Sequence, residues 1–228
     1  MQECYLPTGN EWVSLPTLQA CTGALESFSF LHMGHKGLIE QRGGASHPLM
    51  TPFFETEGER ASLQSLTWGR KSDWIPTFCG TAGSLAVEGM LLAPVGERGF
   101  LYQLTVRSTS DKPLSSTFGL EGCWASAWHC VNEDKEIDGA RRCYTSLWND
   151  SLIFDMRCGL PLFAFAPMMD QPCSSTFQET DAGIVYRLAH ACTLEPGEAV
   201  TVTFYWGVGF EEVAAATSAK EMLRQGWQ

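Results

Sequence analysis

The sequence is short of positive charge. Its 228 residues include 15 lysines and arginines against 26 aspartates and glutamates, so the formal net charge is −11. The calculated isoelectric point is about 4.8. The phosphates of nucleic acids and the headgroups of anionic lipids would be repelled by such a protein. We therefore expect neither a nucleic-acid partner nor a membrane partner.

Long apolar runs and targeting signals are missing as well. No run approaches the roughly 20 apolar residues that a membrane-spanning helix needs. The first residues, MQECYLPTGNEW, contain neither the basic region nor the apolar stretch of a signal peptide. These absences predict a cytoplasmic protein.

The cysteines lack the spacing of a metal site. There are nine of them, and no CxxC pair occurs. Structural zinc sites usually supply their ligands in close pairs, so the sequence predicts no zinc site. In a chain without an export signal we expect reduced thiols. The cysteines are Cys4, Cys21, Cys79, Cys123, Cys130, Cys143, Cys158, Cys173 and Cys192.

Motifs for cofactors and nucleophilic catalysis are also missing. There is no GxGxxG, Walker or GxSxG pattern, and Ser46 and His47 do not form a nucleophile elbow. We expect no cofactor.

Glycoside hydrolysis needs two carboxylates about 5–10 Å apart. The acidic run formed by Glu133, Asp134, Glu136 and Asp138 is more typical of a solvated loop.

What the sequence does have is many short apolar runs that end in Gly, Pro, Asn or Asp, which is typical of an all-β fold. About a dozen strands are expected, whereas the Gly/Pro-rich segment 43–60 is expected to be an irregular loop. The clearest predictions are strands 27–33, 38–41, 100–107, 183–194 and 199–208, with EPGE as the turn between the last two, and a hairpin over 144–158 that turns at Asn149-Asp150.

The C-terminal segment has a helical pattern. Residues 211–226 begin with two glutamates and carry basic residues later, as the helix dipole favours. The expected apolar stripe is Val213, Ala216, Ala219 and Leu223. We predict one β-sandwich domain over 1–210. The helix of 211–228 either packs on the sheet or links the sandwich to a following domain.

The segment EGCWASAWHC, residues 121–130, combines cysteine, histidine and tryptophan. If it forms one strand, Cys123 and Cys130 point to opposite faces. His129 then lies about 20 Å from Cys123. Neither arrangement binds a metal ion. Trp124 and Trp128 would share a face, about 13 Å apart.

The tryptophans are the candidate carbohydrate-binding residues, because the apolar faces of sugar rings stack on aromatic planes. For Trp124 and Trp128 we favour packing in the core or at a domain interface, since both faces of the segment are apolar or small. Tryptophans next to turns are better placed to meet a glycan. The candidates are Trp68, Trp74, Trp124, Trp128 and Trp148.

Four stretches resemble the N-terminal β-sandwich domain of bacterial six-hairpin glycosidases, which include glycogen-debranching, amylo-α-1,6-glucosidase-like and trehalase-like enzymes. They are LLAPVGERGFLYQLTVRSTSDKP (91–113), GLEGCWASAWHCVNEDKEIDG (119–139), PLFAFAP (161–167) and LEPGEAVTVTFYWGVGFEEV (194–213).

The resemblance implies a large antiparallel sandwich of two sheets, the galactose-mutarotase-like supersandwich, with a C-terminal helix. In that family the catalytic carboxylates lie in a separate (α/α)6 barrel, so no catalytic residue is carried over to this chain. The implied function is a non-catalytic domain of a glycoside hydrolase that supports or shapes the substrate cleft. The implied partners are a glycan and the barrel of the same polypeptide.

Two other functions remain open. A carbohydrate-binding module acting alone predicts two or three exposed, coplanar aromatic side chains. A mutarotase-like sugar epimerase predicts a pocket where histidine and glutamate converge. The histidines that could contribute are His32, His35, His129 and His190.

Overall fold

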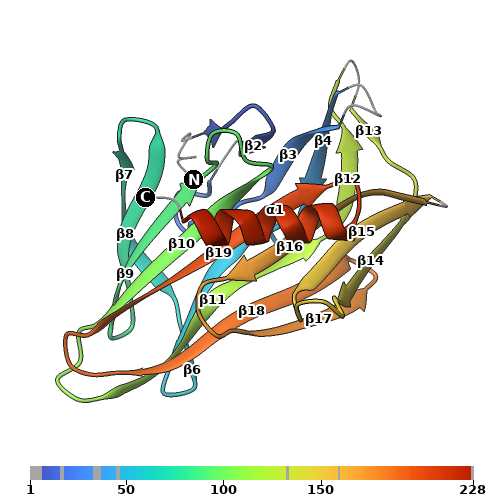
Figure 1. Ribbon diagram of the computed structural model, residues 1–228. Coiled ribbons are helices and arrows are strands. Elements are labelled where there is room, and N and C mark those ends of the chain that lie inside the picture. Colours follow the sequence, from blue (N-terminus) through green and yellow to red (C-terminus); the bar gives the residue numbers. More distant parts are fainter. Residues whose placement is uncertain are drawn as a thin grey trace.

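Nineteen strands and one helix make up the described part of a computed structural model of the protein, shown in Figure 1. The described residues are 7–15, 18–32, 37–44, 47–131, 134–158 and 160–226, and the side chains of 158 and 160–162 are not included in the description. All strand pairs are antiparallel. Within these ranges no helix has the length and apolar character needed to cross a membrane.

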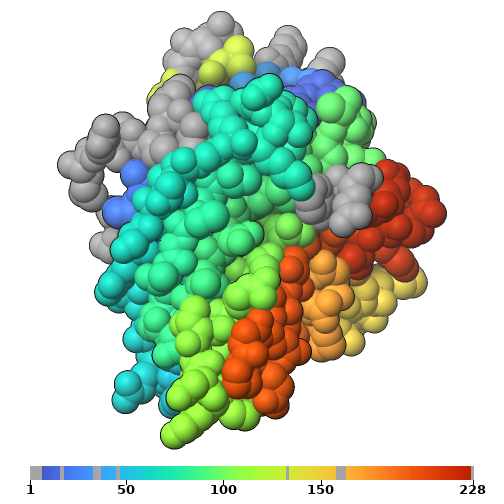
Figure 2. Space-filling model, turned by 90° about the vertical axis from the view of Figure 1, so that its left-hand side faces the viewer, coloured from blue at the N-terminus to red at the C-terminus, as the bar shows by residue number. Residues whose placement is uncertain are grey.

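One layer of the fold is an eight-stranded sheet. Its strands, in spatial order, are β14 (Ala140–Thr145), β15 (Leu152–Cys158), β16 (Leu160–Met169), β19 (Ala199–Gly209), β10 (Gly99–Ser108), β9 (Leu85–Leu92), β8 (Ile75–Ala82) and β7 (Leu63–Lys71). Figure 2 shows the β7–β9 edge of this sheet in turquoise, with the helix in red at one side.

Two smaller sheets face the eight-stranded sheet. The six-stranded sheet contains, in order, β1 (Thr8–Gly9), β2 (Val13–Leu15), β3 (Ser27–His32), β4 (Gly37–Arg42), β12 (Ser126–His129) and β13 (Lys135–Glu136). The five-stranded sheet contains β17 (Ser174–Thr180), β18 (Gly183–Leu194), β11 (Leu114–Trp124), β5 (Thr51–Thr56) and β6 (Glu59–Ala61).

Aromatic side chains fill the space between the layers. The Phe165 ring of the large sheet lies 5.5 Å from Phe28 of the six-stranded sheet and 5.1 Å from Trp124 of the five-stranded sheet. The large sheet therefore packs against both smaller ones through one core. The predicted all-β sandwich is confirmed, except that its second layer consists of two sheets rather than one.

Helix α1 (Glu212–Gln225) confirms the expected C-terminal helix and lies across the outer face of the large sheet (Figure 1). Its buried residues are Ala215, Ala219 and Met222. A Cβ added to Gly207 would lie 2.1 Å from the Ala215 carbonyl oxygen, so the helix backbone rests directly on β19. The expected stripe is confirmed at Ala219, and Ala216 and Leu223 are partly buried against the sheet, whereas Val213 was wrong, because close packing on glycine selects the face with small side chains. Val213 is 59% exposed.

Two other expectations need correction. The segment 43–60 is not all loop, because it contains β5 and the first two residues of β6. Pro52 is accommodated opposite Leu120 in the β5–β11 pair. The segment 121–130 is not one strand. The chain leaves the five-stranded sheet after Trp124 and joins the six-stranded sheet at Ser126, so Trp124 and Trp128 belong to different sheets.

Candidate functional site

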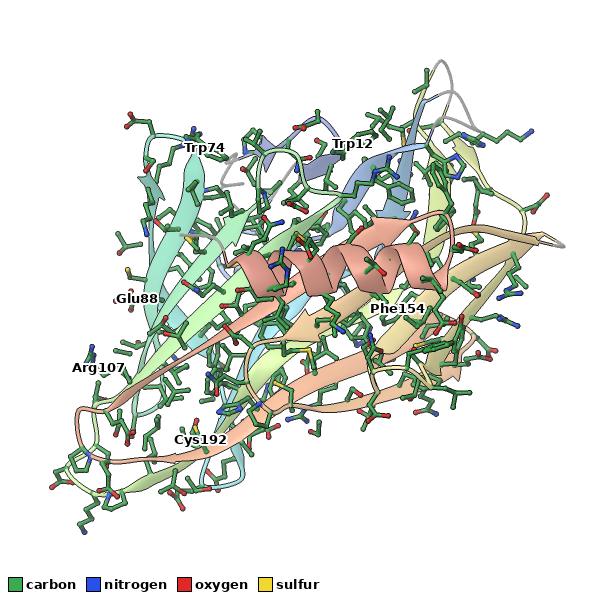
Figure 3. All side chains as sticks on the ribbon, in the orientation of Figure 1. Trp12, Trp74, Glu88, Arg107, Phe154 and Cys192 are labelled. Carbon is green, nitrogen blue, oxygen red and sulfur yellow. The ribbon has the colours of Figure 1, made fainter. Side chains whose placement is uncertain are left out.

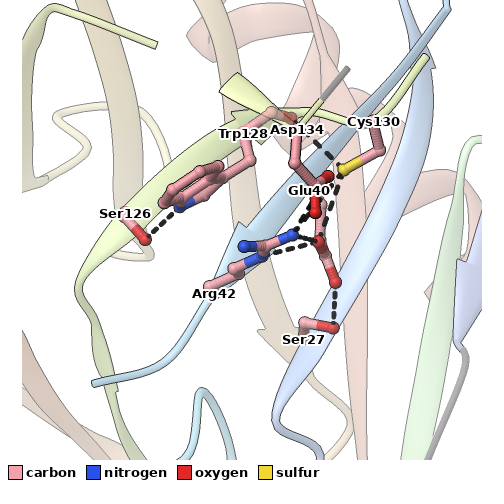
Figure 4. Close-up of polar contacts among 7 residues, drawn as sticks. All are labelled: Ser27, Glu40, Arg42, Ser126, Trp128, Cys130 and Asp134. Atoms are coloured by element: carbon pink, nitrogen blue, oxygen red, sulfur yellow. Dashed lines mark hydrogen bonds and ion pairs between the residues drawn. The ribbon is translucent and has the colours of Figure 1, made fainter. Parts of the chain in front are cut away.

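A polar cluster with one aromatic ring lies on the outer face of the six-stranded sheet (Figure 4). The register places Ser126 opposite Arg42 and Trp128 opposite Glu40. Because side chains alternate along a strand, these four share one face. Their neighbours on the other face, such as Gln41 and Ala127, are buried. Strand pairing thus joins residues more than eighty positions apart in the sequence.

Glu40 is at the centre of this cluster. Its Oε1 accepts a hydrogen bond of 2.6 Å from the Ser27 hydroxyl, and its Oε2 accepts one of 2.6 Å from Arg42 Nε. The Arg42 guanidinium lies 4.4 Å from the centroid of the Trp128 ring and 3.5 Å from an Asp134 carboxylate oxygen. Arg42 is therefore held between an aromatic plane and two carboxylates.

Cys130 follows β12 and completes the cluster. Its Sγ donates to Glu40 Oε2 at 3.4 Å. Burial, and then the hydrogen bond to Glu40, raise the pKa of the Cys130 thiol to about 11. The thiol stays protonated near neutral pH, so it acts as a hydrogen-bond donor and not as a nucleophile.

A hollow of about 490 Å³ opens beside this cluster. Carboxylates, an amide, a hydroxyl and a guanidinium line it together with backbone. The lining residues are Gln19, Glu26, Ser27, Glu40, Arg42, Gly43, Gly44 and Pro48. Part of this polar lining is hydrogen-bonded within itself, since Gln19 Nε2 donates to Glu26 Oε1 at 2.6 Å.

Three side chains, two of them buried, tie the loops beside the hollow to the sheets. The Tyr102 hydroxyl donates to the Gly23 carbonyl at 2.6 Å, and the Tyr186 hydroxyl donates to the Leu49 carbonyl at 2.7 Å. Trp68 Nε1 donates to the Ala20 carbonyl at 2.8 Å. The loops around the hollow are thus fixed by the two sheets behind them, which preforms its shape.

The five candidate tryptophans have different environments. Trp124 is fully buried against Phe154 and Phe165, so it is corrected from a candidate sugar-binding residue to a core residue, and our preference for core packing is confirmed there. Trp68 is partly buried and packs on Phe78. Trp128 is partly buried with Arg42 over one face.

Trp74 and Trp148 are the exposed candidates, at 42% and 85%. They do not form one platform. Trp74 lies in the β7–β8 turn at one edge of the large sheet (Figure 3), whereas Trp148 lies in the β14–β15 turn at the opposite edge. Six strand spacings separate these two turns, or about 30 Å. The coplanar pair that an isolated binding module would use is not formed by these two.

The β14–β15 turn holds two large apolar side chains in solvent. Leu147 is 99% exposed, next to Trp148. The turn is nevertheless ordered by polar contacts, because the Ser146 hydroxyl donates to Glu212 of the helix at 2.8 Å. Ser151 donates to the Asn149 side chain at 2.6 Å. A structured turn that exposes Leu and Trp has the properties of a contact surface.

Sequence reasoning missed the most buried carboxylate, Asp155 of β15. It is 1% exposed and accepts hydrogen bonds of 3.2 Å from both Arg142 Nε and Arg142 Nη2. Arg157 and the Tyr144 hydroxyl donate to it at 3.0 and 3.3 Å. The alternation of charged and apolar residues in LIFDMRC is the signal that could have identified it.

No protein-family model matches the sequence, and no curated protein matches it either. Solved structures do match. A protein assigned as a kojibiose phosphorylase from the human microbiome superposes with a TM-score of 0.60 at 11% identity, over 96% of this chain and 33% of that one. An aldose epimerase homologue from C. elegans superposes with a TM-score of 0.56 at 7% identity, over 91% of this chain and 99% of that one. The chain has the galactose-mutarotase-like sandwich fold.

This sandwich also matches a bacterial glucoamylase complexed with acarbose, with a TM-score of 0.54 at 8% identity over all of this chain and 36% of that one. The chain therefore spans about a third of the length of these carbohydrate enzymes. It spans nearly the whole length of the epimerase homologue. At such identities the match establishes the fold alone.

Two of the candidate histidines, His129 and His190, lie far apart in different sheets. His190 lies opposite Phe118 in the five-stranded sheet and contacts the Pro172 carbonyl. His129 is in the six-stranded sheet, beyond Trp124, and Phe118 and Trp124 alone are about 20 Å apart along β11. His35, Ser46 and Glu133 lie outside the described residues.

No group of three or more His, Cys, Asp or Glu side chains in the described ranges is arranged to hold a metal ion. The acidic run is only partly described. Asp134 is 65% exposed and pairs with Arg42, and Glu136 is 52% exposed beside Arg141. The seven cysteines with described side chains carry free thiols.

Proposed function

We propose that this chain is the non-catalytic β-sandwich domain of a carbohydrate-active enzyme of the glycoside hydrolase type. In this proposal, the hollow beside Glu40, Arg42 and Trp128 contacts the glycan. A separate catalytic (α/α)6 domain of the same polypeptide is the partner. The observation that carries the proposal is the preformed polar hollow next to an aromatic ring, in a fold shared with carbohydrate enzymes.

The chemistry of the hollow suits a neutral sugar. Sugar hydroxyls donate and accept hydrogen bonds, and the planar groups of Gln19, Glu26 and Arg42 offer both kinds of partner. Its volume of about 490 Å³ is within the range of ligand-binding pockets. The excess of acidic side chains favours a neutral glycan over a polyanionic one.

The second support is the exposed β14–β15 turn. Leu147 and Trp148 are almost fully solvated in the isolated chain, and Val213 of the neighbouring helix is 59% exposed. Burying such side chains against another domain would release about 2 kcal/mol for each large residue. We place the contact with the catalytic domain at this edge.

Calorimetric titration with neutral oligosaccharides tests the glycan contact. We expect saturable binding that Glu40→Gln weakens about tenfold, because the substitution removes a charge-assisted partner from the hollow. The matched control is Glu88→Gln on β9, a similar charge change far from the hollow (Figure 3). Equal loss in both variants, or no binding by the folded wild type, would contradict the contact.

Hydrogen exchange tests the docking surface. Amides of residues 146–151 are expected to exchange faster in the isolated chain than in the full polypeptide that contains it. The double variant Leu147→Ser, Trp148→Ser should remove this difference without changing glycan binding at the hollow. A coding sequence with no carbohydrate-active domain in the same reading frame would overturn this part of the proposal.

A carbohydrate-binding module acting alone is the second candidate, favoured by the fact that this chain by itself forms a polar hollow of about 490 Å³. It makes the same prediction for Glu40→Gln. The two candidates differ in their prediction for the β14–β15 turn. For a module acting alone, hydrogen exchange of the turn's amides would be the same in the isolated chain and in any longer polypeptide.

A further inference from the structure

A second recess lies at one end of the sandwich, where β3 of the six-stranded sheet meets β19 of the large sheet. It has a volume of about 270 Å³ and is lined by Trp12, Phe30, Leu31, Arg98, Val208, Gly209 and Phe210. Among the described lining residues, the guanidinium of Arg98 is the only charged group. Figure 3 shows Trp12 at this end of the molecule.

Arg98 is the exception among the stacked arginines. In the described part of the chain, five arginines lie over aromatic rings, and four of them also pair with a carboxylate. Arg98 lies 4.4 Å from the Trp12 ring centroid and 5.9 Å from that of Phe210, but it has no salt bridge and no side-chain hydrogen bond with a described residue. The four paired arginines are Arg42, Arg60, Arg142 and Arg187.

One wall of the recess is held in place by the side chain of Asn10. Asn10 Oδ1 accepts hydrogen bonds of 2.8 Å from the backbone N–H groups of Trp12 and Val13. Asn10 Nδ2 donates to the carbonyls of Pro94 and Glu97, the latter at 2.8 Å. Trp12 and the loop that carries Arg98 are thereby fixed relative to each other. The opposite wall is supported by His32, whose ring meets Phe210 edge-on at 4.8 Å.

A guanidinium has five N–H donors, and a carboxylate accepts two of them side by side. The aromatic and aliphatic lining gives no hydrogen-bond partner to the rest of a ligand, so a hydroxyl-rich sugar ring would lose solvation there. A recess of about 270 Å³ has room for a single ring. We propose that this recess binds a small carboxylic acid with an apolar ring, whose carboxylate pairs with Arg98 and whose ring packs between Trp12 and Phe210.

This site is separate from the polar hollow and does not rest on the proposed function. The two sites have opposite chemistry. The hollow is lined by polar groups that include two carboxylates, whereas the recess is apolar with one unpaired cation.

Titration by heteronuclear NMR, following the Trp12 indole N–H, tests the proposal. The probes are phenylacetate, its neutral amide phenylacetamide, acetate and glucuronate, each up to about 10 mM, because a ligand of about ten heavy atoms binds in the millimolar range or somewhat tighter. We expect saturable shifts with phenylacetate. Phenylacetamide and acetate should bind at least about tenfold more weakly, since each lacks one half of the interaction.

Two variants and one control complete the test. Arg98→Gln should weaken phenylacetate binding about tenfold or more, and Phe210→Ala, at a half-exposed wall, should weaken it while leaving the fold intact. Arg107→Gln is the matched control. Arg107 lies at the other end of β10 (Figure 3), and its substitution removes the same net charge.

Four results would overturn the proposal. They are no shift with phenylacetate, equal binding of phenylacetate and phenylacetamide, an Arg98→Gln variant that binds like Arg107→Gln, and tighter binding of glucuronate than of phenylacetate. The last would assign the recess to a sugar acid, which the apolar lining argues against.

Discussion

Helix α1 covers part of the outer face of the large sheet, whereas the outer face of the six-stranded sheet borders an open hollow of about 490 Å³. On the covered face, glycines and alanines let two backbones touch, which leaves no space for a ligand. On the open face, Glu40 and Arg42 pair with each other and line the cavity, and Trp128 packs against Arg42. The difference suggests that substitutions on the covered face change stability, and that substitutions on the open face change binding.

The largest effect is expected from Gly207→Val. A Cβ at this position would lie 2.1 Å from the Ala215 carbonyl oxygen and 2.4 Å from the Ala219 nitrogen, so the helix must move away. We expect a loss of about 3 kcal/mol or more in the free energy of unfolding, measured in urea.

The control for this prediction is Gly69→Ala in β7, where the nearest atom to the new Cβ is 3.4 Å away. It should leave stability nearly unchanged. If Gly207→Val were as stable as this control, the direct contact of helix and strand would be refuted.

Asp155→Asn is expected to have the next largest effect. The buried carboxylate accepts hydrogen bonds from Arg142, Arg157 and Tyr144, and the amide cannot neutralise two guanidinium groups. A loss of about 2 kcal/mol is expected from thermal or urea unfolding. Glu221→Gln, which breaks the exposed pair with Arg224 on the same helix-covered side, should give no measurable change.

Tyr102→Phe tests a link between the large sheet and the hollow, because Tyr102 of β10 holds Gly23, in the loop whose Gln19 and Glu26 line the hollow. Loss of the buried hydrogen bond should cost about 1 kcal/mol. It should also weaken glycan binding at the hollow, because the rim is no longer fixed. Unchanged binding together with reduced stability would show that the rim does not need this anchor.

The smallest effect is expected at alkaline pH. The pKa of the Cys130 thiol is raised to about 11 in the folded protein, above the value of about 8.5 for a free thiol. The stability that this thiol contributes is therefore complete below about pH 8.5 and is lost as the pH rises toward 11. Cys130→Ser should show a shallower loss between pH 8 and 10 than the wild type in urea titrations, and parallel curves would contradict this assignment.

The strands that the sequence predicted well are those in which local signals agree. Strand β18 has the predicted bounds 183–194, and β19 extends the predicted 199–208 by one residue, because apolar residues recur on both sides of the EPGE turn. The prediction of an irregular loop over 43–60 was wrong, because the proline and glycine residues of this segment indicate a loop when they are considered locally. Pairing with β11 nevertheless extends residues 51–56 into a strand.

The sequence predicted only part of the candidate site. Trp128 was identified from its residue type, but its partners Glu40 and Arg42 are brought to it by the pairing of β4 with β12. The sequence did not single out Arg98, because its lack of a carboxylate partner among the described residues is a property of its surroundings in space. Burial likewise separates Trp124 from Trp128, although they are only four residues apart.

The sequence by itself determined the all-β class, the C-terminal helix, the strong turns and the acidic character, since each follows from local patterns or from composition. Only the tertiary structure decided which side of the helix is buried, where EGCWASAWHC changes sheets, and which polar groups meet around the hollow. The physical reason is that antiparallel pairing and layer packing bring together residues far apart in the chain, and a local pattern carries no information about its distant partner.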